Sequence, residues 1–362
     1  AGTSALRVRE VMSAVARTVG VQQVEAQVTF TQIVLTVGRR GIFRTQVGET
    51  RPSVDADRIA RLHQFSHELP ERERAIDVEA RLDAIEHQPR CYPTWLLVTL
   101  VALACASVSV LSNGGWREVL AVLPASALAY TAHRTLTRLQ FNLLAVVLTS
   151  AALASALYVG FAALITAVAG APSPRFAAGF ICASIFLIPG FPLVTAGLDL
   201  TRLDLDAGVP RLTYAAMVLL AMAIGVWLVA SIAGVSPAPV APNEGHPAIV
   251  WTALIAASFF AVFGWATMFN VPLATAVASG VVAVVGNVPR LLLLAADVKP
   301  HVATFVGCVI MGLGCAVVAG WFKMTKIIMT VPTLLVSIPG SSALRTLIYF
   351  DQADIVSAIE SG

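Results

Sequence analysis

The spacing of hydrophobic residues changes at about residue 90. Before that point, three stretches carry apolar residues at helical intervals, which predicts amphipathic helices over 5–19, 55–69 and 71–87. Three short stretches with the alternating or compact apolar character of β-strands lie between the first two helices, over 24–30, 33–37 and 42–47. We therefore predict a small α+β domain over residues 1–90.

From Tyr92 onward the chain is almost continuously apolar. A helix needs ~20 apolar residues to cross the hydrocarbon core of a bilayer. Nine segments are long and apolar enough to be considered, near 93–112, 117–133, 141–169, 175–198, 211–234, 247–265, 271–288, 301–321 and 326–349. The predicted fold class is a mainly α-helical polytopic membrane protein, preceded by the soluble domain.

Two of the apolar segments contain Ile-Pro-Gly near their centres, at 188–190 and 338–340. Proline and glycine interrupt a helix, and lipid offers no partner for the backbone groups that are released. Such a break is tolerated where it faces protein or a polar cavity, so it predicts a solute site in a transporter. A plain proline kink is the alternative.

The broken segments supply the first candidate binding residues, which are Pro189, Gly190, Pro192, Pro339 and Gly340. The N-terminus of a half-helix offers N–H groups and a positive dipole to a carboxylate, while released carbonyls can accept an ammonium group. We therefore expect a site near the membrane midplane, between the two broken helices.

The spacing of these features indicates an internal repeat. The two Ile-Pro-Gly sites lie 150 residues apart, and Pro124 and Pro272 lie 148 apart. Segments one to five then match segments six to ten. Because five is odd, the second copy would insert inverted, with the first repeat over 91–235 and the second over 246–362. A tenth span is expected beyond Gly362, and a nine-span protein is the alternative.

Composition and charge support the same division. The chain is 57% hydrophobic and 12% charged, yet residues 1–90 hold 13 of the 24 Lys+Arg and 12 of the 21 Asp+Glu. The positive and negative charges nearly balance, with a net charge of +3, and the sequence contains no basic tract. Both observations argue against nucleic acid as a partner.

Loop charges favour a cytoplasmic N-terminal domain, because cytoplasmic loops retain Lys and Arg. The expected inner loops carry Arg134, Arg138, Arg202, Arg211, Lys323 and Lys326, against Arg117, Arg175, Arg290 and Lys299 in the outer loops.

Several motifs together resemble the bacterial threonine/serine exporter family. The first half carries Leu-Ile-Pro-Gly-Phe-Pro-Leu-Val at 187–194, Asp-Leu at 199–200 and Gly-Val-Pro-Arg-Leu at 208–212. The second half carries Phe-Asn-Val-Pro at 269–272, Arg-Leu-Leu-Leu at 290–293, Val-Pro at 331–332 and the second Ile-Pro-Gly. Where the family often has Tyr-Arg after the second Pro-Gly, this chain has Leu344-Arg345.

The resemblance implies ten spans, a cytoplasmic N-terminal domain and export of threonine and serine across the bacterial inner membrane. It implies energy from the proton gradient or the membrane potential. A related two-subunit branch is associated with succinate, so a small dicarboxylate is the alternative substrate. The lipid bilayer, the substrate and a coupling proton are the expected partners, and a homo-oligomer stays open.

Three polar residues join the candidate site. Asp199 matches the family pattern and could carry a coupling proton or gate the inner mouth, with an ordinary helix-closing role as the alternative. Asn270 could bind substrate, although capping or interhelical bonding is more common for such amides. Arg345 could neutralise a carboxylate or extend to the interface.

Other chemistry finds little support in the sequence. His63 and His67 lie four apart but lack the pattern of a zinc protease, so no metal and no cofactor is expected. The motifs G-x-x-x-x-G-K and G-x-S-x-G do not occur. We expect no enzyme; a membrane-anchored hydrolase or a ligand sensor that uses the N-terminal domain is the alternative from another class.

Overall fold

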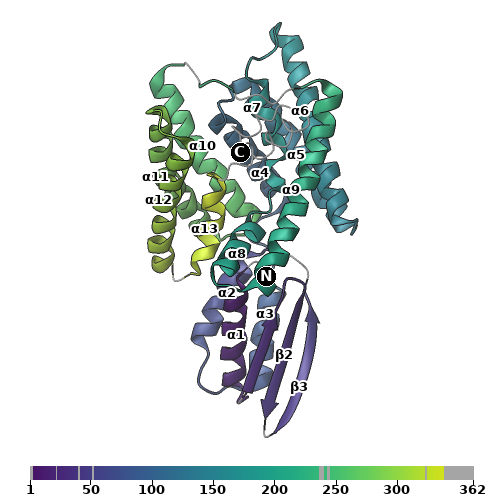
Figure 1. Cartoon of the computed structure of the whole chain (residues 1–362), viewed down its shortest axis with the longest axis vertical. Helices are drawn as coiled ribbons and strands as arrows, with labels where there is room; N and C mark the ends of the chain where they lie inside the picture. Colours follow the sequence, from purple (N-terminus) through teal and green to yellow (C-terminus); the bar gives the residue numbers. More distant parts are fainter. Residues whose placement is uncertain are drawn as a thin grey trace.

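The computed structural model describes residues 3–337, except 22, 40, 51–52, 236–239, 243–244 and 323. A soluble domain lies at one end of the molecule and a layer of long helices at the other (Figure 1). The second Ile-Pro-Gly, and with it Pro339, Gly340 and Arg345, lies outside the described residues.

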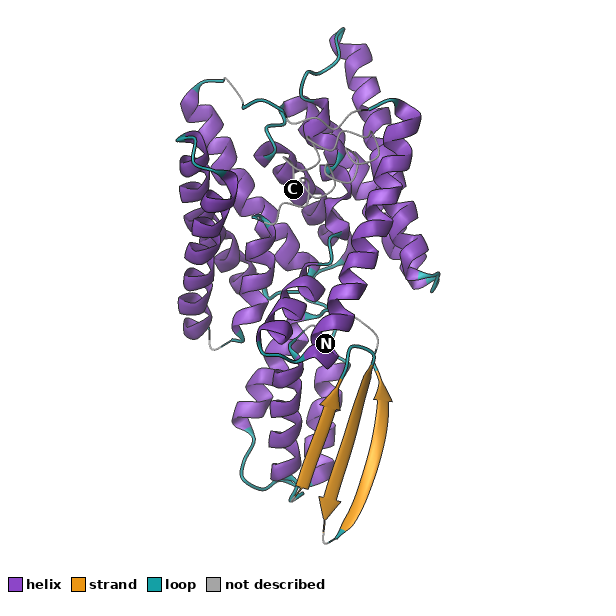
Figure 2. Cartoon of the chain, in the orientation of Figure 1, coloured by secondary structure: helices purple, strands orange, loops and turns teal. Residues whose placement is uncertain are grey.

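The soluble domain is a three-stranded antiparallel sheet beside three helices (Figure 2). The chain order is α1 (Ala5–Thr18), β1 (Gln23–Val28), β2 (Gln32–Arg39), β3 (Ile42–Glu49), α2 (Ala56–Glu68) and α3 (Ala75–Glu86). Asp55 caps α2 by accepting a hydrogen bond from the Arg58 amide, so the helix begins one residue after the predicted start. Each element falls close to its predicted limits.

The membrane helices follow the nine apolar segments. They are α4 (Thr94–Leu111), α5 (Trp116–Arg138), α6 (Leu143–Ala169), α7 (Phe176–Phe180) with the 3-10 helix η1 (Cys182–Leu187), α8 (Gly190–Thr201), α9 (Leu205–Ala233), α10 (Pro247–Met268), α11 (Leu273–Ala295), α12 (Pro300–Trp321) and α13 (Lys326–Leu335). Within the described residues, six single helices are long and apolar enough to cross a membrane, and the bent α7–α8 stretch makes up to seven.

Three of these helices extend beyond the apolar segments that predict them. α5 continues to Arg138, α9 already begins at Leu205, and α11 continues to Ala295. Arg134, Arg211 and Arg290 are therefore helical, whereas the loop-charge argument places them in loops. The reason is that an apolar segment marks hydrocarbon, while a helix can continue past it into the protein interior or the interface.

The two membrane halves repeat the same packing in opposite directions. The contacts of α4 with α5, α5 with α6, and α4 with η1 recur as α10 with α11, α11 with α12, and α10 with α13. The start of α4 meets the end of α10, where the Cys91 amide donates to Asn270 Oδ1 at 2.9 Å. At the other end, Asn113 donates to the carbonyl of Val240 at 3.1 Å. The first helices of the two halves are thus antiparallel, as an inverted repeat requires.

Small residues bring these helices close together. A Cβ at Gly264 on α10 would lie 2.3 Å from the Leu100 carbonyl of α4, and one at Gly225 on α9 would lie 2.4 Å from the Leu148 carbonyl of α6. Such contacts are the usual basis of helix packing in membranes, where lipid removes the hydrophobic drive between helices.

Candidate functional site

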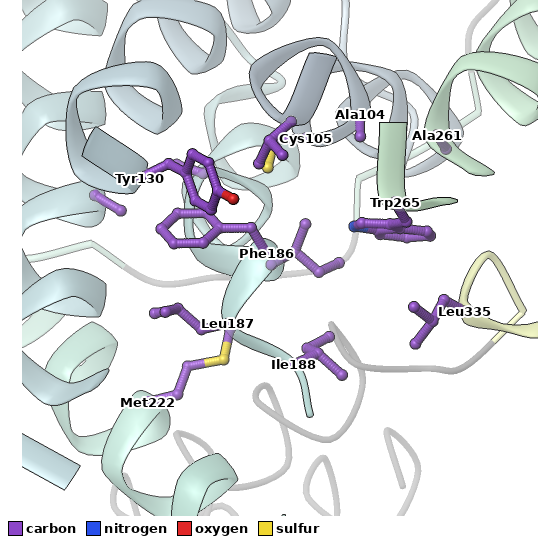
Figure 3. Close-up of a cluster of buried hydrophobic side chains, with 14 of the residues drawn as sticks. Ala104, Cys105, Tyr130, Phe186, Leu187, Ile188, Met222, Ala261, Trp265 and Leu335 are labelled. Atoms are coloured by element: carbon purple, nitrogen blue, oxygen red, sulfur yellow. The ribbon is translucent and has the colours of Figure 1, made fainter. Parts of the chain in front are cut away.

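The first Ile-Pro-Gly breaks its membrane segment sharply. The helices on either side meet at an angle of 68°. Pro189 has φ −79° and ψ 64°, and the Gly190 amide donates to the Ile188 carbonyl at 2.8 Å, which together define an inverse γ-turn. Figure 3 shows Phe186, Leu187 and Ile188 leading into this turn, with Leu335 of α13 nearby.

The turn leaves fewer free amides than a simple half-helix would. The Gly190 amide is used within the turn, Pro192 has no N–H, and the Leu193 amide donates to the Pro189 carbonyl at 3.0 Å. Among the described hydrogen bonds, this leaves the Phe191 amide as the one free donor of the first turn of α8. The start of α8 therefore offers an anion fewer backbone N–H donors than the sequence predicts.

A cavity of about 460 Å³ begins at this break and runs between the soluble domain and the membrane helices. Pro189, Gly190 and Pro192 line one end of it, and Thr29 and Ser53 of the soluble domain line another. Its volume is within the usual range of small-molecule sites.

The charged side chains that line the cavity are all cationic. They are Arg90, Arg134, Arg138 and Arg211, with His133 beside them, and none of the lining residues that the structure describes is acidic. In the described part of the chain, Arg211 is the one member of this set that forms an ion pair. Arg134 lies 5.9 Å above the ring of Tyr130, and its Nη1 is buried without a hydrogen-bond acceptor. The cavity is thus suited to an anion.

Asp199 lies at the end of α8 and is 1% exposed. One carboxylate oxygen accepts from Arg211 Nη1 at 2.6 Å, and the other accepts from the Ala5 amide at 3.3 Å. Arg211 also donates to the Thr3 carbonyl at 3.1 Å. Asp199 therefore holds the start of α1 against α8 and α9, and it is not among the residues that line the cavity.

Asn270 lies at the turn between α10 and α11 with φ +61°, a left-handed conformation that asparagine tolerates. Its amide donates to Asp55 Oδ1 at 2.7 Å and accepts from the Cys91 amide at 2.9 Å. Beside it, the Ala56 amide donates to the Phe269 carbonyl at 2.9 Å. Both ends of the Asn270 side chain are thus used, one to dock the soluble domain through Asp55 and the other to hold the start of the first membrane half through Cys91.

His63 and His67 lie with their ring centroids 4.5 Å apart in the soluble domain, and His63 contacts Arg7. Burial and the positive charge of Arg7 lower the pKa of His63. Among the described residues, no group of three His, Cys, Asp or Glu side chains has the arrangement of a metal site.

The candidate site residues predicted from the sequence therefore do not all lie together. Pro189, Gly190 and Pro192 share one cavity, whereas Asp199 and Asn270 lie at two separate docking points. The sequence analysis missed Arg90, Arg134 and Arg138 as members of the site. The i, i+4 spacing of Arg134 and Arg138 at the end of an apolar segment was the available signal, because it puts two cations on one helix face.

An inverted repeat of membrane helices with a broken span beside a cavity defines a polytopic membrane transporter. The chain belongs to the threonine/serine exporter family. The family model described as "Putative threonine/serine exporter" matches residues 1–233, and the model described as "Threonine/Serine exporter, ThrE" matches residues 254–362. The resemblance stated from the motifs is confirmed.

Two curated relatives are both named "Probable succinate transporter subunit YjjP". The protein from Klebsiella aerogenes is 29% identical over 238 residues, which cover 62% of this chain and 85% of the relative. The protein from Escherichia coli K12 is 27% identical over 246 residues, which cover 64% and 89%. No solved structure matches this chain.

Proposed function

We propose that the protein is a secondary exporter of small carboxylates across the bacterial inner membrane, with the soluble domain in the cytoplasm. The observation that carries this proposal is the cavity that joins the Pro189 break to four arginines, with no carboxylate among its described lining residues. Residues of the soluble domain line part of that cavity, and the excess of Lys and Arg in the expected inner loops supports its cytoplasmic side.

A dicarboxylate fits this cavity better than a zwitterionic amino acid does. Each additional carboxylate gains a charge-assisted hydrogen bond to a guanidinium, whereas an ammonium group meets no acidic side chain among the described residues of the lining. The names of the two relatives support the same class of substrate. We therefore place succinate-like dianions first.

Threonine and serine are the second candidate. The family descriptions support them, and the backbone carbonyls around the broken helix could accept an ammonium group. Coupling to the proton gradient or the membrane potential completes the proposal, with alternating access through rocking of one half against the other.

Counterflow of labelled succinate, threonine and serine in proteoliposomes tests the proposal. We expect succinate to be exchanged fastest, and an imposed pH gradient or potential to drive net flux. Arg134→Gln should lower succinate exchange by about tenfold or more, since a hydrogen bond to a charged group is worth ~1.5–3 kcal/mol.

Arg202→Gln is the matched control, because Arg202 is exposed at the end of α8 and is not in the cavity lining. Faster exchange of threonine than of succinate, or succinate exchange that is unchanged in Arg134→Gln, would contradict the dicarboxylate assignment. Passive flux that ignores both gradients would contradict coupled export.

A further inference from the structure

The second membrane half contains a polar cluster that the cavity does not include. Asn287 of α11 is fully buried and donates to Ser258 Oγ of α10 at 2.8 Å. Arg290 donates through Nη1 to Asn287 Oδ1 at 3.0 Å and through Nε to Thr304 Oγ1 of α12 at 3.3 Å. Three helices of the second half thus converge on one guanidinium.

This cluster lies at the end of the membrane layer away from the soluble domain. α11 begins at Leu273, immediately after the turn that docks α2, and runs away from that domain. Arg290 comes 17 residues further on, or about 26 Å along the helix axis at 1.5 Å per residue. The cavity arginines and Arg290 are therefore at opposite ends of the helices.

Among the residues that the structure describes, the hydrogen-bond partners of Arg290 are neutral. No ion pair of the described residues includes it. Its described hydrogen bonds go to Asn287 and Thr304, and the thiol of Cys308 is a further neutral neighbour. Its Nη2 has no acceptor among the described hydrogen bonds. Arginine stays charged in proteins, and an uncompensated cation among membrane helices is costly, so its retention there points to a function.

The internal repeat relates Arg290 to the first cavity. α5 and α11 begin 157 residues apart, at Trp116 and Leu273, and α6 and α12 also begin 157 apart. Arg290 is 157 residues from His133, which neighbours Arg134 and joins α5 to α6 through Ser150 Oγ at 3.2 Å. Arg290 joins α11 to α12 in the same way.

The correspondence extends toward the second break. In the first half, the ring of His133 lies 6.0 Å from that of Phe186, two residues before Ile188. In the second half, Gly307 packs against Arg290, and Met311, one turn further along α12, receives a hydrogen bond from Ser337 at 3.7 Å. Ser337 directly precedes the second Ile-Pro-Gly. Each half thus sets a nitrogen-bearing side chain near the approach to its own break, the His133 imidazole in the first half and the Arg290 guanidinium in the second.

We propose that Arg290, positioned by Asn287 and Thr304, is a second carboxylate-binding site, which the substrate occupies on the side of the membrane opposite the soluble domain. The proposal rests on the proposed export of carboxylates. It assigns the cavity arginines to the inner side and Arg290 to the outer side, so that a carboxylate passes between two guanidinium sites related by the inverted repeat.

Counterflow with succinate offered from one face at a time tests this assignment, in proteoliposomes whose protein orientation is fixed. Arg290→Gln should raise the KM at the face opposite the soluble domain by about tenfold, as expected for the loss of a charged hydrogen bond, and change the KM at the other face much less. Arg134→Gln should raise the KM at the face of the soluble domain and change the KM at the opposite face much less. Arg290→Lys keeps the charge and should recover part of the affinity.

Lys299→Gln is the matched control, because it removes an exposed cation near the same end without touching the cluster. Monodisperse elution of each variant excludes misfolding as the cause of a change. If the KM at both faces is unchanged in Arg290→Gln and in Arg290→Lys, the second site is overturned, while succinate exchange by the unaltered protein still supports export.

A direct readout separates the site from the transport activity. Cys308 is partly exposed on α12 and interacts with Arg290. Succinate should slow alkylation of Cys308 by iodoacetate, followed by peptide mass mapping, in the detergent-solubilised protein but not in Arg290→Gln. Protection of Cys308 without any carboxylate transport would retain the Arg290 site and overturn the proposed export. Carboxylate transport with neither protection nor a face-specific KM shift would retain the export and overturn the Arg290 site.

Discussion

The soluble domain is attached to the two membrane halves by different chemistry. On the first half, a buried ion pair between Asp199 and Arg211 holds Thr3 and Ala5 at the start of α1. On the second half, the neutral amide of Asn270 and backbone groups hold the start of α2. Breaking a buried ion pair costs more than losing the hydrogen bonds of a neutral amide. The difference suggests that the domain stays with the first half when the halves move.

The largest expected effect comes from the ionic attachment. Asp199→Asn should destabilise the protein by about 3–5 kcal/mol, because it leaves the Arg211 charge buried without its partner. Thermal unfolding in detergent measures this loss.

The double variant Asp199→Asn with Arg211→Met should recover much of the stability, since it removes both charges together. Strictly additive losses in the double-mutant cycle would show that the pair is not coupled, and the contrast between the two attachments would then fail.

The contact between the halves at the break is the next test. A Cβ at Gly190 would lie 2.6 Å from Leu335 Cδ2, so Gly190→Ala should overpack the junction, at a cost of about 1–3 kcal/mol, and slow exchange. Counterflow rate and thermal unfolding are the measurements.

Gly197→Ala on the same helix is the control, because a Cβ there meets no atom within 4 Å. Adding Leu335→Ala to Gly190→Ala should restore exchange. Equal effects of the two glycine variants would mean that the halves do not meet tightly at the break.

The smallest effect is expected at the neutral attachment. Asn270→Gly keeps the positive φ available and removes the side-chain bonds to Asp55 and Cys91, at about 1–2 kcal/mol. The alkylation rate of Cys91, followed by mass mapping, should rise as the domain loosens.

Asn270→Asp provides the comparison for Asn270→Gly, since it keeps the size of the side chain but sets a carboxylate against Asp55. It should loosen the domain further than glycine does. If Cys91 in both variants reacts as in the unaltered protein, the Asn270 amide does not hold the domain.

The sequence was most informative where local signals mark an element. Asp55 caps α2 one residue from the predicted start, and the Ile-Pro-Gly at 188–190 produces the expected break. The inverted order of the helices also followed from spacing alone. The limits of α5 and α11 were missed because arginines lie within their last two turns, and hydropathy treats arginine as a loop residue.

The site was less predictable than the fold. The cavity draws on residues as far apart as Thr3 and Phe269, and periodicity does not tell which distant segments meet. The γ-turn at Pro189 uses an amide that a simple half-helix would leave free, so the sequence overestimated the number of backbone donors at the break. The guanidinium groups of the cavity were not part of the predicted site. Asn270 and Asp199 show that polar residues in family motifs can serve docking.

The tight packing of α4 against α10 at Gly264 and Leu100 has a consequence for how the chain could be divided. The covalent link between the halves is the stretch 234–246, whereas their cohesion comes from this contact, from Gly190 against Leu335, and from the soluble domain. Cleavage of that linker would leave a two-chain protein whose pieces stay associated. The same architecture could then be encoded as one polypeptide or as two.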